Sequence, residues 1–148
     1  MRLTSVWLAL SLAACSGNSA PSLSISDARA RPTVTATQTA VVYLLITNSG
    51  PAADRLESVA TGIGAASLHS SSMSGGVMRM RAIDGVDIPA NSTIKFEPMG
   101  NHIMVEGLKA PLAAGSSLPL TLRFQSSPPQ TITVQVRSSA GETEHHAH

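Results

Sequence analysis

Short segments in which apolar and polar residues alternate recur along the chain. The alternation is clearest in LPLTLRF (Leu118–Phe124) and TITVQVR (Thr131–Arg137). A period of two residues is typical of a strand with one buried face. Together with other short segments that contain β-branched residues between turn residues, they predict eight strands at Leu23–Ala30, Ala40–Thr47, Ala65–Ser70, Val77–Arg81, Ser92–Glu97, His102–Glu106, Leu118–Phe124 and Thr131–Arg137.

Turn-forming residues separate these segments. NSGP at 48–51, SGG at 74–76, IPANS at 88–92 and SSPPQ at 126–130 combine Gly, Pro, Asn and Ser, which favour turns. Helical periodicity of useful length is absent from the sequence, and so is an internal repeat. Many short strands at this spacing predict an all-β domain, a β-sandwich or barrel.

The N-terminus has a different pattern. A positive residue, Arg2, precedes a short apolar run from Val6 to Ala14, which is well below the ~20 residues that span a bilayer. The run ends in LAAC, which resembles a bacterial lipobox, and this implies cleavage before Cys15 and lipidation of its thiol. The alternative is an ordinary signal peptide with an incidental Cys. We therefore expect a leader at 1–14, a lipidated tether at 15–21, a β domain at 22–137 and a tail at 138–148.

Charge and cysteine content narrow the possible functions. The chain has ten Lys and Arg against nine Asp and Glu, and loss of Arg2 with the leader would leave nine of each. This balance offers no basic patch for nucleic acid. Cys15 is the single Cys, so the domain has no disulfide, no C-x-x-C motif and no thiolate for a blue-copper site. No arrangement of residues indicates an enzyme.

His and Met gather in one third of the sequence. The stretch Leu68–Met104 holds both His residues outside the last four positions and five of the six Met. Residues two apart on a strand share a face, about 7 Å apart, so His102 and Met104 are predicted to face one site. The SGG turn would fold the strand carrying His69 back toward Met80. Two imidazoles and two thioethers are soft or borderline donors and favour Cu(I) over Mg²⁺ or Ca²⁺.

The spacing of these residues resembles a known family. His69, Met80, His102 and Met104 match the H-x10-M-x21-H-x-M motif of the PCuAC periplasmic copper chaperones, and GGVMRMR, GLKAPLAAG and PLTLRF are similar as well. The resemblance implies a cupredoxin-like, Greek-key β domain that holds Cu(I) on these four residues. It also implies delivery toward the CuA centre of cytochrome c oxidase subunit II, a Sco-like thioredoxin-fold co-worker, and a location at the periplasmic face of a Gram-negative membrane.

Several alternatives remain beside this interpretation. The protein could instead buffer copper without a specific client. Met78 is interpreted as core filler, Met73 as a pocket wall or surface residue on a loop, and Met99, which replaces a Gly of the family, as an auxiliary ligand or none. Arg29, Arg31, Arg55, Asp27 and Asp54 are interpreted as surface charges or barrel-end ion pairs. The tail could bind Cu(II) through His145, His146 and His148 or have no role.

Overall fold

The structure is a computed structural model that describes residues 19–35 and 39–138. The predicted leader, Cys15 and the three tail histidines lie outside these residues. The described part of the chain forms ten strands: β1 (Leu23–Ala30), β2 (Ala40–Asn48), β3 (Asp54–Ala60), β4 (Ala65–Ser74), β5 (Val77–Ala82), β6 (Val86–Ile88), β7 (Ser92–Phe96), β8 (Asn101–Glu106), β9 (Ser117–Phe124) and β10 (Gln130–Val136). No helix in these residues is long and apolar enough to cross a membrane.

The all-β prediction is confirmed, with two strands more than the eight expected. Each predicted segment coincides with a strand, but β3 and β6 were missed. The pairing of β3 with β9 shifts register between Leu56 and Ser58, so buried positions do not alternate regularly along it. β6 has three residues, too few for a period of two to be recognised.

The strands form one sheet that curls around a shared core. Their order is β5-β4-β8-β7-β2-β1-β10-β9-β3-β6. β2 is long enough to pair with β7 along its second half and with β8 along its first. Curling brings β3 near β4 and β6 near β7, although neither pair is hydrogen-bonded. The apolar faces of the strands therefore meet inside one sandwich-like body, with Phe96, Leu44 and Ile46 among the largest fully buried side chains.

A buried amide joins three loops at one end of this body. Asn48, at the end of β2, is fully buried. Its Oδ1 accepts hydrogen bonds from the amides of Ser22 and Gly50, at 3.1 and 3.0 Å, and its Nδ2 donates to the carbonyls of Ala52 and Pro89, at 2.8 and 3.2 Å. Both hydrogens of Nδ2 and the oxygen Oδ1 of Asn48 therefore have hydrogen-bond partners, as a buried amide requires.

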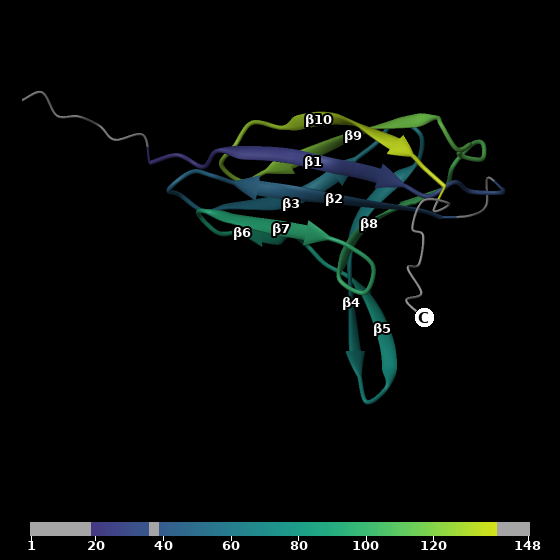
Figure 1. Cartoon of the computed structure of the whole chain (residues 1–148), viewed down its shortest axis with the longest axis horizontal. Helices are drawn as coiled ribbons and strands as arrows, with labels where there is room; N and C mark the ends of the chain where they lie inside the picture. The colour runs from purple at the N-terminus through teal and green to yellow at the C-terminus, as the bar shows by residue number, and fades with distance from the viewer. Residues whose placement is uncertain (1–18, 36–38, 139–148) are drawn as a thin grey trace, which may run out of the picture.

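The hairpin of β4 and β5 differs from the rest of the sheet. It extends away from the body as a two-stranded arm (Figure 1). The one buried residue of β4, Leu68, lies in its first half, and every residue of β5 is exposed. Gly75 and Gly76 make the turn with positive φ angles of 58° and 77°, which suits a two-residue hairpin. The functional residues predicted from the sequence lie where this arm joins the body.

Candidate metal centre

Three adjacent strands bring the predicted ligands onto one face. β8 pairs with β4 so that His102 lies opposite His69 and Met104 opposite Ser67, and β4 pairs with β5 so that Ser71 lies opposite Met80. Residues directly opposite share a face, and so do residues two apart. Ile103 pairs with Leu68 on the reverse face, where both are buried in the core. All four predicted residues therefore occupy the face directed away from the core.

Met80 and His102 are in direct contact. The Nε2 atom of His102 lies 3.1 Å from the Sδ atom of Met80. The imidazole is buried, with 6% of its surface exposed, whereas Met80 is 53% exposed. A fixed nitrogen donor thus meets a thioether that solvent can reach, although the two residues are 22 positions apart in the sequence.

A backbone carbonyl sets the tautomer of His102. The Nδ1 atom of the ring lies 3.1 Å from the carbonyl oxygen of Gly100, which can only accept a hydrogen bond. The neutral ring therefore carries its proton on Nδ1, and the lone pair of Nε2 points to the sulfur. Two lone-pair donors that face each other at this distance favour a cation between them. The same Nδ1–H···O=C bond is the usual outer-shell support of a metal-binding His.

His69 completes a pair of rings. Its centroid lies 5.8 Å from that of His102, with the ring planes 23° apart. One nitrogen, Nε2, is 3.0 Å from the hydroxyl of Ser67, but the other, Nδ1, is buried and has no hydrogen-bond partner among the described residues. Buried polar atoms are nearly always paired, so this unpaired ring nitrogen beside a second imidazole is a candidate metal donor.

Met104 occupies the fourth position through register rather than through a direct contact. It is half-buried on β8, with Ser67 of β4 opposite on one side and Val41 of β2 opposite on the other. The structure thus places His69, His102 and Met80 together by ring and atom contacts, and Met104 beside them on the same face. The donors are imidazole and thioether. No group of three or more His, Cys, Asp and Glu suited to a metal occurs in residues 19–35 and 39–138.

The turn before β8, which contains Met99 and Gly100, positions His102, a role that the sequence analysis did not assign to it. The carbonyl of Gly100 also accepts a hydrogen bond from the amide of Ser71, at 3.0 Å, so it links β4 to His102. Met99, next to it, has a positive φ of 65° and is 61% exposed. Glycine adopts this conformation without strain, whereas Met99 does so at a cost. The signal in the sequence was Met99 in the PMGNH segment, at the position where the resemblance implies a Gly.

Two methionines of the hairpin lie elsewhere than predicted. The interpretation of Met78 as core filler is wrong, because its side chain is 49% exposed on β5. Met73 is a surface residue, 56% exposed, but it belongs to β4 and not to a loop. The reason is shared: β4 continues past His69 to Ser74, beyond the body, where no other element of residues 19–35 and 39–138 covers either face.

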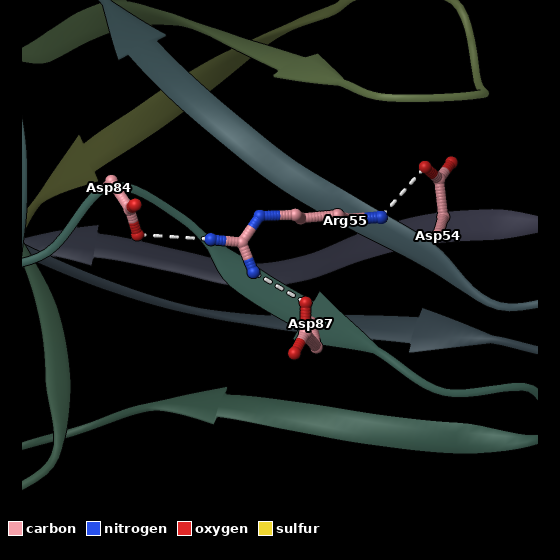
Figure 2. Close-up of polar contacts among 4 residues, drawn as sticks. All are labelled: Asp54, Arg55, Asp84 and Asp87. Carbon is pink, nitrogen blue, oxygen red and sulfur yellow. Dashed lines mark hydrogen bonds and ion pairs between the residues drawn. The ribbon is translucent and has the colours of Figure 1, made fainter.

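A charged cluster secures the segment that follows β5. The guanidinium of Arg55 on β3 forms ion pairs with Asp84 at 3.0 Å and with Asp87 at 2.5 Å (Figure 2). The hydrogen bond that Arg55 donates to Asp87 is the main reason that the pKa of Arg55 is raised. A Cβ atom at Gly85 would lie 2.8 Å from this guanidinium, so the loop needs glycine there. The cluster attaches the loop between β5 and β6 to the body.

Asp54, expected to be a surface charge or an ion-pair residue, is instead a buried acceptor. Its carboxylate accepts hydrogen bonds from the amides of Arg55, Ser126 and Ser127, at 2.8, 2.9 and 3.0 Å. Burial alone would raise its pKa, but hydrogen bonds from Ser127, Ser126 and Arg55 outweigh burial and lower the pKa below 3.8. The Asp-Arg pair therefore has two structural roles: Asp54 fixes the loop after β9, and Arg55 fixes the loop after β5.

Comparison with known proteins agrees with this architecture. A family model described as "Putative lipoprotein LpqE-like" matches residues 23–136. The chain belongs to this family. It is 40% identical over 80 residues to "Putative lipoprotein Lxx21020" of Leifsonia xyli subsp. xyli (strain CTCB07), and the match spans about half the length of that relative, 48%, and 53% of this chain.

Solved structures extend the likeness to the whole fold. The copper-bound PCuAC domain from PmoF2 superposes with a TM-score of 0.66 at 21% identity, covering 78% of this chain and 92% of that domain. The Cu(I) form of DR1885 from Deinococcus radiodurans superposes with a TM-score of 0.60 at 23% identity, covering 86% and 84%. The PCuAC-type, cupredoxin-like β fold predicted from the sequence is thus confirmed.

Proposed function

We propose that this protein is a copper metallochaperone that binds one Cu(I) ion through His69, Met80, His102 and Met104. The observation that carries the proposal is the contact between His102 Nε2 and Met80 Sδ at 3.1 Å, with the lone pair of Nε2 directed at the sulfur. The unpaired Nδ1 of His69 and the position of Met104 supply the two further donors. Imidazole and thioether together select Cu(I) among the common biological cations.

The exposure of the ligands favours transfer over storage. His102 is buried and held by Gly100, so one ligand stays in place when the ion leaves. Met80 is half-exposed on β5, an edge strand of the sheet that the described residues form, so a client's donor atom can approach the ion from there. A neutral thioether binds less tightly than a thiolate, which suits an ion that must be released. The proposed function is binding and delivery, without catalysis.

The proposal also names the protein that would receive the copper. The resemblance to the PCuAC chaperones suggests the CuA centre of cytochrome c oxidase subunit II as the destination, with a Sco-like protein acting beside it. The second candidate is copper buffering at a membrane, which the same soft and exposed site would also serve. Occupancy of CuA in a deletion strain grown at limiting copper separates them. Loss of CuA supports delivery, whereas copper sensitivity with normal CuA supports buffering.

Membrane attachment is proposed through Cys15. The LAAC junction and membership in a family described as lipoproteins support it. We expect Cys15→Ser to release the protein from the membrane fraction without changing its Cu(I) affinity. Mass spectrometry of the mature N-terminus checks this, and an unmodified Cys15 or another cleavage point would contradict it. The side of the membrane is proposed to be extracytoplasmic, and the periplasmic face of a Gram-negative membrane stays a prediction.

The main test replaces each sulfur ligand by a hydrocarbon of similar volume. Met80→Leu and Met104→Leu should change stability by less than about 1.5 kcal/mol. Each should weaken Cu(I) binding at least as much as the loss of an outer-shell partner does, roughly 10- to 100-fold. His69→Gln and His102→Gln should weaken it as well. Competition against a chromophoric Cu(I) chelator measures the affinity, and X-ray absorption counts sulfur and nitrogen neighbours.

Matched controls come from the same hairpin. Met73→Leu and Met78→Leu remove thioethers that lie further along β4 and β5, so the affinity for the first Cu(I) ion should stay the same. Parental affinity in both the Met80 and Met104 variants, or a spectrum without sulfur near copper, would overturn the assignment.

The C-terminal histidines are proposed as a separate, weaker Cu(II) site. Its ligands would be His145, His146 and His148. Removal of residues 145–148 should abolish one Cu(II) binding step and leave the Cu(I) stoichiometry unchanged. Identical Cu(II) titrations with and without these residues would show that the tail binds no Cu(II).

A further inference from the structure

Two more thioethers stand on the ligand face of the hairpin, near its tip. Met73 of β4 lies directly opposite Met78 of β5, next to the Gly75–Gly76 turn. Cβ atoms of directly opposed residues are roughly 4.5–5.5 Å apart, so two flexible thioethers at these positions can reach one ion. Both residues are two positions from residues of the ligand face, Met73 from Ser71 and Met78 from Met80, and therefore share that face.

Packing does not explain these residues. Met73 and Met78 are 56% and 49% exposed, and no residue of β5 is buried. Strands favour β-branched and aromatic side chains, so an exposed strand selected for its backbone alone would carry Val, Ile or Thr. Methionine differs from those residues in its sulfur, and the two Met residues lie directly opposite each other in the register.

The two faces of the hairpin have different chemistry. Arg79 and Arg81 lie on the reverse face, opposite Ser72 and Ser70. The ligand face carries Met73, Met78 and Met80 without a charged side chain between them in the register. An apolar docking patch would need only hydrocarbon, whereas a row of thioethers that leads to two imidazoles has the donor set of a soft cation.

We propose that Met73 and Met78 form a second, weaker site for a soft monovalent cation, Cu(I) or Ag(I), at the tip of the hairpin. The site lies one two-residue step, about 7 Å along the strand, from Met80. This deepens the proposed function, because Met80 then separates an outer thioether pair from the inner His and Met centre. With two neutral sulfurs, no imidazole and open access to water, the outer site holds the ion less tightly than the inner one.

The experiment observes each methionine separately. The mature chain carries Cys15→Ser, so that no thiolate competes, and ¹³C-labelled methionine methyl groups are followed by NMR during titration with Ag(I). The first equivalent should shift Met80 and Met104. Further Ag(I) should shift Met73 and Met78 together, with a single Kd roughly tenfold or more above the first.

Single variants test whether the two sulfurs act as one site. Met73→Leu should abolish the shift of the Met78 methyl group, and Met78→Leu should abolish that of Met73, with backbone signals of the folded hairpin retained. Met99→Leu, which removes an exposed thioether from another turn, should leave both shifts unchanged. An unshifted pair in the parent chain, or Met78 titrating with the parental Kd in Met73→Leu, would overturn the proposal.

The same titration keeps the two proposals apart. If the outer pair does not bind, Met80 and Met104 still shift with the first equivalent. If the inner centre is wrong, Met80 and Met104 do not shift first, while the signals of Met73 and Met78 continue to test the outer site by themselves.

Discussion

Strands β2 and β5 belong to the same sheet but differ in what their side chains contact. In β2, buried residues alternate with half-buried ones along its whole length, because one face lines the core. In β5, at the edge of the sheet, every residue is exposed. Burial stabilises the first strand and constrains its residues to be apolar. The second strand buries no residue, so core packing does not constrain its sequence. Its residues can instead be metal donors, and it carries Met78 and Met80.

The two kinds of region meet within one strand. In β8, Ile103 and Val105 are fully buried, whereas His102 and Met104 occupy the opposite face. Consecutive residues of this strand therefore alternate between packing in the core and facing the proposed metal site. The core side determines whether the domain folds, and the other side determines what it binds. Substitutions can test this separation one residue at a time.

The largest effect is expected on the core side of β8. Ile103→Ala leaves a cavity against Leu68 and should lower the free energy of unfolding by about 3 kcal/mol. The Cu(I) affinity of the molecules that remain folded should stay near the parental value, because the ligands keep their positions. Urea denaturation of the metal-free protein and chelator competition measure the two quantities. Met104→Leu should give the reverse result, and a similar loss of stability in both variants would contradict the separation.

An intermediate effect is expected at Asp54, in the body and away from the ligands. Asp54→Asn replaces Oδ2, which accepts the hydrogen bond from Ser127, by an NH2 group, and it removes the charge that strengthens the two bonds to Oδ1. It should cost about 1–2 kcal/mol at neutral pH. Since the pKa of Asp54 is lowered in the folded state, its stabilisation is present above 3.8 and is lost as pH falls through the folded-state pKa.

Denaturation at a series of pH values checks this expectation. The parent and the Asn variant should differ most at neutral pH and converge below pH 3.8. A difference that is constant across this range would show that the charge of Asp54 has no part in the effect. Copper binding at neutral pH should be the same in both proteins.

The smallest effect is expected at Met99, in the turn beside His102. Met99→Gly relieves a positive φ of 65° and should stabilise the metal-free protein by about 0.5 kcal/mol, after the extra flexibility of glycine in the unfolded chain is counted. Met99→Leu keeps the strain and should leave stability unchanged. Equal Cu(I) affinity in both variants and the parent would remove Met99 from the ligand set, whereas a matching loss in both would assign its sulfur to copper.

The local sequence pattern was sufficient to predict most of the strands and to predict which side chains of a strand lie on the same face. Alternation, β-branched composition and the flanking turn residues identified eight of the ten strands. These signals failed for β3, where the register shifts, and for β6, which is three residues long. The two-residue spacing of His102 and Met104 already placed both side chains on one face, because successive residues of any strand point to opposite sides. The Gly-Gly turn likewise specified a hairpin between His69 and Met80 from a few neighbouring residues.

Only the tertiary structure decided which strands are neighbours and what each face meets. The position of β8 beside β4 sets His69 against His102, 33 residues further along the chain, and no local pattern contains that pairing. The carbonyl of Gly100 reaches Nδ1 of His102 and the amide of Ser71 only after the strands have assembled. Exposure of Met78 was misjudged for the same reason. A strand's own sequence gives its period, but burial depends on whether another part of the chain covers it, and nothing in the described structure covers β5.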